Sequence, residues 1–79
     1  MADKTYGVAK DVKRALGRKV REMRTARGWS QEQMGEASDL HWTYVGQVER
    51  GERNLTLNSI HSIAKAFKIK ISELTQGVD

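Results

Sequence analysis

Residues 41–54, with the sequence HWTYVGQVERGERN, bring amide, hydroxyl, aromatic and guanidinium side chains together in one short segment. Val45 and Val48 are three residues apart, which predicts the buried face of a short helix over 42–50. The outer face of that helix is left with Trp42, Thr43, Gly46, Gln47 and Arg50. Side chains of these types donate and accept hydrogen bonds, so the segment is suited to binding a polar partner.

The composition argues against catalysis and against a metal or other cofactor. The 79-residue chain has no cysteine, which excludes thiolate ligands and thiol nucleophiles. No Ser or Thr stands beside a His with an orienting acid, as nucleophilic catalysis requires. His41 and His61 are far apart without matching ligands, so we expect a protein that is not an enzyme and holds no metal.

Charge is distributed unevenly along the chain. Residues 1–31 contain nine Lys/Arg and three Asp/Glu, whereas residues 32–79 contain five and seven. A basic region favours a polyanion as partner, although solvated helices also carry Lys and Arg for solubility alone. The asymmetry by itself leaves both interpretations open.

The sequence shows no sign of a targeting or membrane segment. Its N-terminus lacks the apolar core of a signal peptide, and no apolar run approaches the roughly 18 residues that span a bilayer. We therefore expect a cytoplasmic protein without membrane contact. A chain of this length supports one small domain, here 9–76, between flexible tails at 1–8 and 77–79.

Apolar spacing predicts an all-α domain of five short helices. A first helix over 12–27 has apolar residues at spacings of four, four and three, and should end at Gly28. A second helix over 31–38 begins with Ser30 as its cap, and Gln33 completes a capping box.

The remaining helices follow the 42–50 segment. Thr56 is a plausible cap for a fourth helix, which has the most regular apolar stripe in the chain. Ser72 and Glu73 predict a short capped turn of helix near the C-terminus.

The 31–38 and 42–50 segments together form a helix-turn-helix arrangement, because a turn of three or four residues joins them. In such a pair the second helix enters the DNA major groove, which is about 12 Å wide, with its first turn nearest the base edges. That placement selects as candidate DNA contacts His41, Trp42, Thr43, Gly46 and Gln47.

Four motifs carry a resemblance to a known family. They are RxxRG at the end of the first helix, SQEQM opening the second, TYVGQVERGERN through the third and SIAKAFKI in the fourth. Across residues 17–74 the sequence resembles the Cro and phage-repressor type of helix-turn-helix protein, also called the xenobiotic-response-element family. The tyrosine-containing third helix, followed by ERGERNLT in a short chain without an effector domain, is most similar to controller proteins of restriction-modification systems.

The resemblance assigns roles to matching positions. It places base-reading side chains at Trp42, Thr43, Gly46 and Gln47. Gln47 would pair with adenine, and Thr43 would bond a base or touch a thymine methyl. Contacts to the DNA backbone are implied for Gln31, Tyr44, Arg50, Arg53 and Asn54, and His41 is also expected to meet phosphate. An ion pair between Arg24 and Glu49 would align the first and third helices.

Three positions depart from the family pattern. Gly35 stands where alanine is usual, at a cost of ~1 kcal/mol of helix propensity, and Asp39 replaces the usual turn glycine. Trp42 stands where controllers often have arginine, so it should favour thymine methyls, sugars or DNA shape over guanine. Alternatively, Trp42 folds back on the 31–38 helix or meets a neighbouring molecule, and Tyr44 packs beside that helix.

Apolar side chains near the C-terminus exceed the needs of a small core. We expect a homodimer interface comprising His61, Phe67, Ile69, Ile71 and Leu74. The alternative is that the apolar members seal the bottom of the helix bundle. Two-fold pairing would place two reading helices about 34 Å apart on one face of the DNA.

The expected function is sequence-specific binding of double-stranded DNA. A homodimer would bind a pseudo-palindromic operator and regulate the transcription of restriction-modification genes. Two alternatives stay open: a phage-type repressor or autoregulating antitoxin, and a protein-interaction module of the same fold. RNA polymerase is left open as a further partner, and no small-molecule effector is expected.

Overall fold

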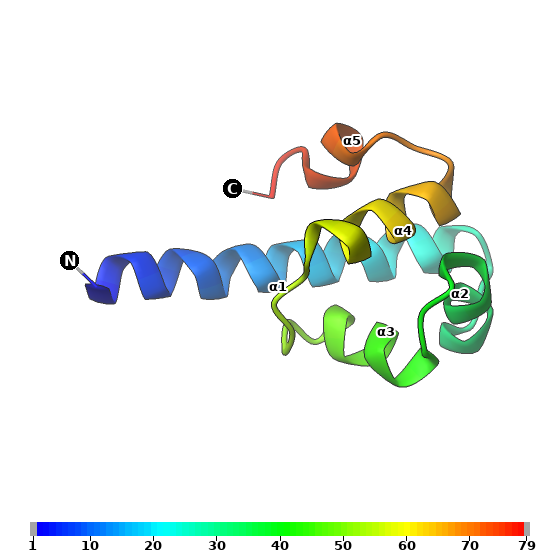
Figure 1. Ribbon diagram of the computed structural model, residues 1–79, viewed down its shortest axis with the longest axis horizontal. Helices are drawn as coiled ribbons and strands as arrows, with labels where there is room; N and C mark the ends of the chain where they lie inside the picture. Colours follow the sequence, from blue (N-terminus) through cyan, green and yellow to red (C-terminus); the bar gives the residue numbers. More distant parts are fainter. Residues whose placement is uncertain (1, 79) are drawn as a thin grey trace.

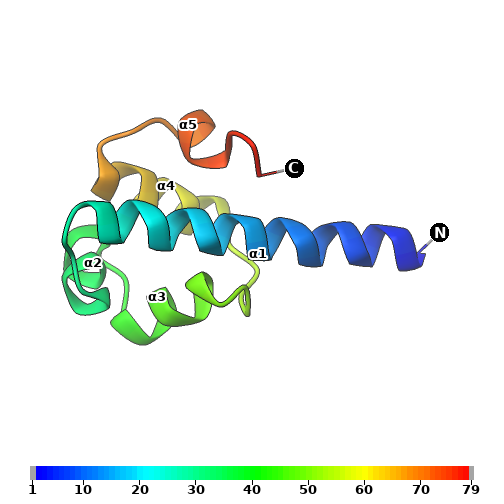
Figure 2. The same ribbon diagram turned by 180° about the vertical axis from the view of Figure 1, so that it is seen from behind.

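The computed structural model describes the backbone of residues 2–78 and the side chains of residues 12–78. Over the described backbone, the chain forms α1 (Ala2–Ala26), α2 (Gln31–Ser38), α3 (Trp42–Glu49), α4 (Leu57–Phe67) and α5 (Ile71–Thr75). The predicted all-α class is confirmed. In projection the long α1 runs between α3 and α5, and α4 overlaps it (Figures 1 and 2). Within residues 2–78, no helix combines the length and the apolar character that crossing a bilayer demands.

Both predicted tails contain described structure. Residues 1–8 are predicted to be a flexible tail, and residues 2–8 of it are helical and extend α1 beyond the other helices (Figures 1 and 2). A formed helix propagates at little cost because its nucleus already exists, whereas apolar periodicity marks only the turns that face a core. At the other end Val78 packs against the core. Met1 and Asp79 lie outside the described residues, and the mobility of both tails stays a prediction.

Tight turns set the spacing of the first three helices. α1 is followed by Gly28 with a φ of 71°, as predicted. α2 is followed by Asp39 with a φ of 59°, and the amide of Leu40 donates to the carbonyl of Gly35 at 2.9 Å. A Cβ on Gly35 would lie only 2.6 Å from the carbonyl oxygen of Leu40. The glycine therefore gives the turn the room it requires, which offsets its weak helix propensity.

The core takes apolar side chains from all five helices. Its members are Leu16, Val20, Met34, Val45, Val48, Ile63, Ala64, Phe67 and Leu74. Val45 and Val48 are buried, as their spacing predicts. Phe67 and Leu74 correct the expected dimer interface, because they are 3% and 0% exposed within the single chain. These two residues seal the bundle and have no surface to offer a partner.

The N-terminal cap of α5 (Ile71–Thr75) is Lys70, two residues before the predicted cap. Ser72 lies inside the helix, and the amide of Lys70 donates to Glu73 Oε1 at 2.9 Å instead. Lys19 of α1 donates to the carbonyls of Glu73 and Gln76 at 2.7 and 2.6 Å. A cation at a helix C-terminus satisfies free carbonyls, so this contact ties α5 to α1.

Candidate nucleic-acid interface

The outer face of α3 carries the side chains predicted to read bases. Trp42 is 51% exposed and Thr43 is exposed on the first turn, and Gln47 is half-buried one turn later. α3 lies at the margin of the molecule, on the side of α1 opposite to α5 (Figure 1). A single helix presented in this way fits the width of the major groove.

Gly46 differs from the expectation, because it is buried and not open on the outer face. A Cβ at this position would lie 3.2 Å from Arg50 Nη1 and 3.3 Å from Gln31 Oε1. The missing side chain makes room for these two polar groups to lie across α3. Gly46 thus affects the candidate interface through the side chains of Arg50 and Gln31. The predicted direct contact of Gly46 with a base needs correction, because Gly46 is buried in the unbound chain.

Glu49 joins three helices. Nε and Nη2 of Arg24 in α1 donate to Glu49 Oε2 and Oε1 at 2.5 and 3.0 Å. Nε2 of Gln31 in α2 donates to Glu49 Oε1 at 3.2 Å. The side chains of Arg24 and Glu49 are only 12% and 3% exposed. Hydrogen bonding to Glu49 raises the pKa of Arg24, with a further contribution from charge attraction and an opposing one from burial.

Arg53 lies between two α3 side chains. Its Nε donates to Gln47 Oε1 at 2.7 Å, and its guanidinium carbon is 5.5 Å from the centroid of the Tyr44 ring. The Tyr44 hydroxyl donates to Ser59 Oγ at 3.2 Å. Tyr44 is therefore tied to α4, which differs from the alternative in which it packs beside α2. Sequence reasoning missed Ser59, although its position three residues after the helix cap Thr56 was a usable signal.

The remaining candidates for backbone contact lie at the end of α3 and in the loop that follows. Arg50 and Asn54 are both exposed. Arg50 Nε donates to Glu52 Oε2 at 3.1 Å, and both side chains of this ion pair are more than half exposed. Exposed pairs contribute little stability, so Arg50 can exchange Glu52 for a phosphate. The sequence does not predict this ion pair, because Arg50 and Glu52 lie at the end of a helix and in the loop after it, where no periodic pattern marks side-chain contacts.

His41 caps α3. Its Nδ1 accepts a hydrogen bond from the amide of Thr43 at 3.1 Å, so the ring proton is on Nε2, where it can be donated to a phosphate. The imidazole and Trp42 rings are stacked with centroids 5.8 Å apart. Among the side chains that the structure describes, no group of three or more His, Cys, Asp or Glu is placed to hold a metal ion.

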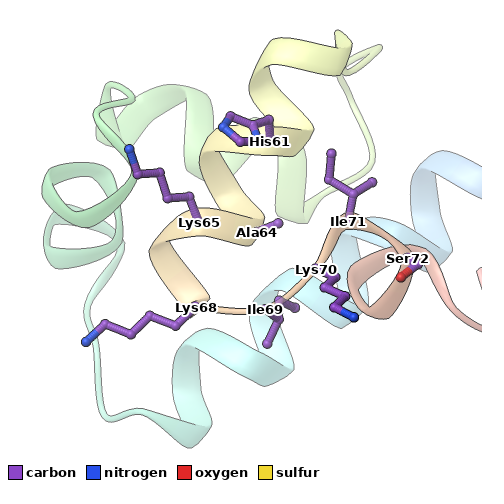
Figure 3. Close-up of a pocket in the computed structure, with 8 residues that line it drawn as sticks. All are labelled: His61, Ala64, Lys65, Lys68, Ile69, Lys70, Ile71 and Ser72. Atoms are coloured by element: carbon purple, nitrogen blue, oxygen red, sulfur yellow. The ribbon is translucent and has the colours of Figure 1, made fainter.

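A second candidate surface is the hollow between α4 and α5 (Figure 3). It is lined by His61, Ala64, Lys65, Lys68, Ile69, Lys70, Ile71 and Ser72. Ile71 is 38% exposed and Ile69 is half-buried. Lys65 and Lys68 extend outward on the same side of α4, with their ends diverging (Figure 3). Of the predicted dimer residues, His61, Ile69 and Ile71 thus remain accessible on this face.

Comparison with known proteins gives consistent matches. The Helix-turn-helix family model, HTH_3, matches residues 20–74. Control protein C.SmaI of Serratia marcescens is 45% identical over 64 residues, which cover 81% of this chain and 76% of the relative. Control protein C.BamHI of Bacillus amyloliquefaciens is 37% identical over 65 residues, covering 81% of this chain and 80% of the relative.

A solved structure extends the similarity to three dimensions. The crystal structure of the restriction-modification controller protein C.AhdI from Aeromonas hydrophila superposes with a TM-score of 0.74 and 46% sequence identity. The match covers 77% of this chain and 92% of that one. The chain belongs to the helix-turn-helix family of DNA-binding transcriptional regulators and is similar, within it, to restriction-modification controller proteins.

Proposed function

We propose that the protein acts in the cytoplasm as a homodimer that binds a pseudo-palindromic operator through α3 and controls restriction-modification genes, including its own. One observation carries the proposal: Trp42 and Thr43 are exposed on the outer face of α3. At the same time Arg24, Glu49 and Gln31 tie this helix to α1 and α2. A reading helix that is fixed in advance loses less conformational freedom on binding. The similarity to control proteins supports the choice of regulated genes.

Base readout is assigned to the outer face of α3. The Thr43 hydroxyl can bond a base, and its methyl group can touch a thymine methyl. The Gln47 amide can address a purine edge, as glutamine does with adenine. Trp42 offers a broad, half-exposed apolar surface, which suits thymine methyls, sugars or DNA shape.

Contacts to the DNA backbone are assigned to residues that flank the outer face of α3. Arg50, Arg53 and Asn54 are exposed at the end of α3 and after it. Gln31 stands at the first position of α2, where free amides and the helix dipole favour a phosphate. Each phosphate that is neutralised releases counterions, so affinity should fall steeply as salt rises.

The α4–α5 face is the proposed dimer interface. Ile71, 38% exposed, provides its apolar centre, and His61 and half-buried Ile69 also line it (Figure 3). Lysines of two copies that face each other would repel, and the exposed Glu73 of a two-fold related copy can offset this repulsion. Such pairing would present two copies of α3 to successive major grooves about 34 Å apart.

Mobility shifts test the DNA-binding proposal directly. Wild-type protein should bind DNA upstream of its gene at least about 1,000-fold more tightly than random DNA at physiological salt. Thr43→Ala and Gln47→Ala should change which half-sites are preferred. The control is Asn54→Ala, because Asn54 is assigned to contacts with the DNA backbone. This substitution should lower the affinity for all DNA sequences by a similar factor. Equal affinity for upstream and random DNA would rule out operator recognition.

Sedimentation equilibrium tests the dimer. Ile71→Asp puts a charge at the apolar centre and should shift the protein towards monomer. Leu57→Asp is the matched control, because Leu57 is a still more exposed apolar residue, at 77%, and lies outside the α4–α5 hollow. An Ile71→Asp protein that stays dimeric, or a wild-type protein that is monomeric at operator-binding concentrations, would contradict this interface.

An acidic edge of α2 is compatible with RNA polymerase as a further partner. Glu32, Glu36 and Asp39 are exposed and line a hollow that Trp42 borders. Carboxylates repel phosphates, so this edge of α2 fits a basic protein surface better than DNA. Glu36→Lys should retain operator binding and lose transcriptional activation in a purified system. Unchanged activation by the variant would exclude this edge as the polymerase contact.

A further inference from the structure

We propose that Arg53 is a positioning residue for base readout, which fixes the amide of Gln47 before DNA arrives. The inference rests on the proposed function, since it assumes that Gln47 reads a base. It assigns Arg53 a role beyond gripping phosphate: Arg53 determines which end of the Gln47 amide the DNA meets.

The hydrogen bond from Arg53 to Gln47 sets the amide orientation. Arg53 has only donors, and its Nε lies 2.7 Å from Gln47 Oε1. An amide flipped by 180° would place its NH2 group against the guanidinium, so the arrangement selects one orientation. Gln47 is half-buried, and its NH2 group is left as the donor for a base acceptor such as a purine N7.

Arg53 is itself held by a chain of contacts that leads to α4. Its guanidinium carbon lies 5.5 Å from the centroid of the Tyr44 ring. The Tyr44 hydroxyl donates to Ser59 Oγ at 3.2 Å, and Ser59 receives further support from the cap Thr56, whose Oγ1 accepts from the Ser59 amide at 3.0 Å. The base reader is therefore connected to the N-terminus of the neighbouring helix and not only to its own.

The connection predicts a particular kind of specificity. A free glutamine can present either its oxygen or its NH2 group and so tolerates several bases. With Oε1 engaged by Arg53, the NH2 group is presented consistently, and bases that lack an acceptor at that point are rejected. Removing Arg53 should therefore reduce discrimination at the base pair read by Gln47, in addition to any loss of phosphate attraction.

The test measures the ratio of the affinities for two operator variants that differ at one base pair. A phosphate contact is the same in both variants, so its loss does not change this ratio. The base pair read by Gln47 is first found as the position where Gln47→Ala changes the preference among single-base-pair operator variants. Arg53→Met should then lower the wild-type preference at this position by about tenfold. Arg50→Met is the matched control, since Arg50 is also exposed and paired only across a surface ion pair, and it should leave the ratio unchanged.

A double-mutant cycle and a measurement without DNA complete the test. In the Gln47→Ala background, Arg53→Met should change the ratio no further. NMR order parameters of the Gln47 side-chain amide should fall in the Arg53→Met protein, with thermal unfolding unchanged. An unchanged ratio or an equally mobile amide would overturn the inference. A wild-type protein that shows no preference at any base pair would instead refute the proposed function.

Discussion

The two ends of α3 differ in how the rest of the molecule holds them. At the last turn, Glu49 accepts a hydrogen bond from Arg24 at 2.5 Å, and Gln47 accepts one from Arg53 at 2.7 Å. At the first turn, Trp42 is 51% exposed, and its aromatic neighbour is the adjacent residue His41. One short helix therefore combines a proposed base contact whose side chain is held by a neighbour with a proposed DNA contact whose side chain is free to adjust its position.

The difference has a consequence for DNA recognition. A side chain that is already ordered gives up little rotamer freedom on binding and can discriminate between base edges. A large exposed aromatic side chain can follow the groove and respond to its shape or to thymine methyls. We infer that Gln47 on the last turn contributes base discrimination and that Trp42 on the first turn contributes contact area.

Removing the ion pair between Arg24 and Glu49 at the last turn of α3 should have the largest effect on stability. Glu49→Ala leaves the charge of Arg24 in a site where its side chain is only 12% exposed. Removing one partner of a buried pair typically costs about 3 kcal/mol or more, because the remaining charge is uncompensated. Urea unfolding should show this loss, and operator affinity should fall with it because α3 is no longer aligned.

A double substitution and a pH series sharpen this result. Glu49→Leu combined with Arg24→Met should recover most of the stability, because no charge is left unpaired. The raised pKa of Arg24 means that its contribution is complete below the ordinary arginine pKa and is lost only as pH rises through the raised value. Titration of Arg24 should therefore change stability little between about pH 6 and about pH 9. A Glu49→Ala protein as stable as wild type would show that the pair does not hold α3.

Alanine substitutions at Gly17 and Gly46 compare the inner and outer faces of α3, and we expect them to change stability less than Glu49→Ala does. A Cβ on Gly17 in α1 would overlap the carbonyl oxygen of Val48 and lie 2.7 Å from that of Glu49. Both atoms are backbone, so Gly17→Ala should force α1 and α3 apart and cost about 2 kcal/mol. Urea unfolding measures the change.

Gly46→Ala is the control for this pair. Its Cβ would meet only the flexible ends of Arg50 and Gln31 at 3.2 and 3.3 Å, and alanine favours the helix. Stability should stay within about 1 kcal/mol of wild type, while operator binding weakens because the two displaced side chains alter the DNA-facing surface. Equal destabilisation by both substitutions would contradict the contrast between a packed inner face and an adaptable outer one.

Changing the first turn should have the smallest effect on stability. Trp42→Ala removes a side chain that is half exposed, so the free energy of unfolding should change by about 0.5 kcal/mol or less. Operator affinity should fall by about tenfold if the ring covers sugars or thymine methyls. Leu57→Ala, at an exposed apolar site on α4, should leave both quantities unchanged in gel shifts and unfolding. Wild-type affinity in the Trp42→Ala protein would place the ring outside the complex.

Sequence reasoning located the elements better than the relations between side chains. The buried pair Val45 and Val48 followed from helical spacing, and the stop at Gly28 followed from the need for a left-handed residue. Phe67 and Leu74 were assigned to a dimer interface, because a hydrophobic side chain looks the same in sequence whether its own chain or a second copy covers it. Burial within the chain is what distinguishes the two cases.

The details of the candidate site were harder to predict. Gly46 was expected on the open outer face because α3 was considered alone, and the side chains that cover it come from Arg50 and from another helix. The link between Arg53 and Gln47 depends on the path of a loop, which has no periodicity in the sequence. Helix positions therefore came from local pattern, whereas the polar connections needed three-dimensional placement.

In the proposed complex, α3 is held by its last turn and reads a symmetric operator as part of a homodimer. The most direct test of this proposal is the affinity of the wild-type protein for a library of all single-base-pair variants of the upstream DNA. The largest losses should fall in two mirrored groups of base pairs about 34 Å apart, one turn of DNA, on one face. A single group, or losses spread evenly over the sequence, would contradict the claim.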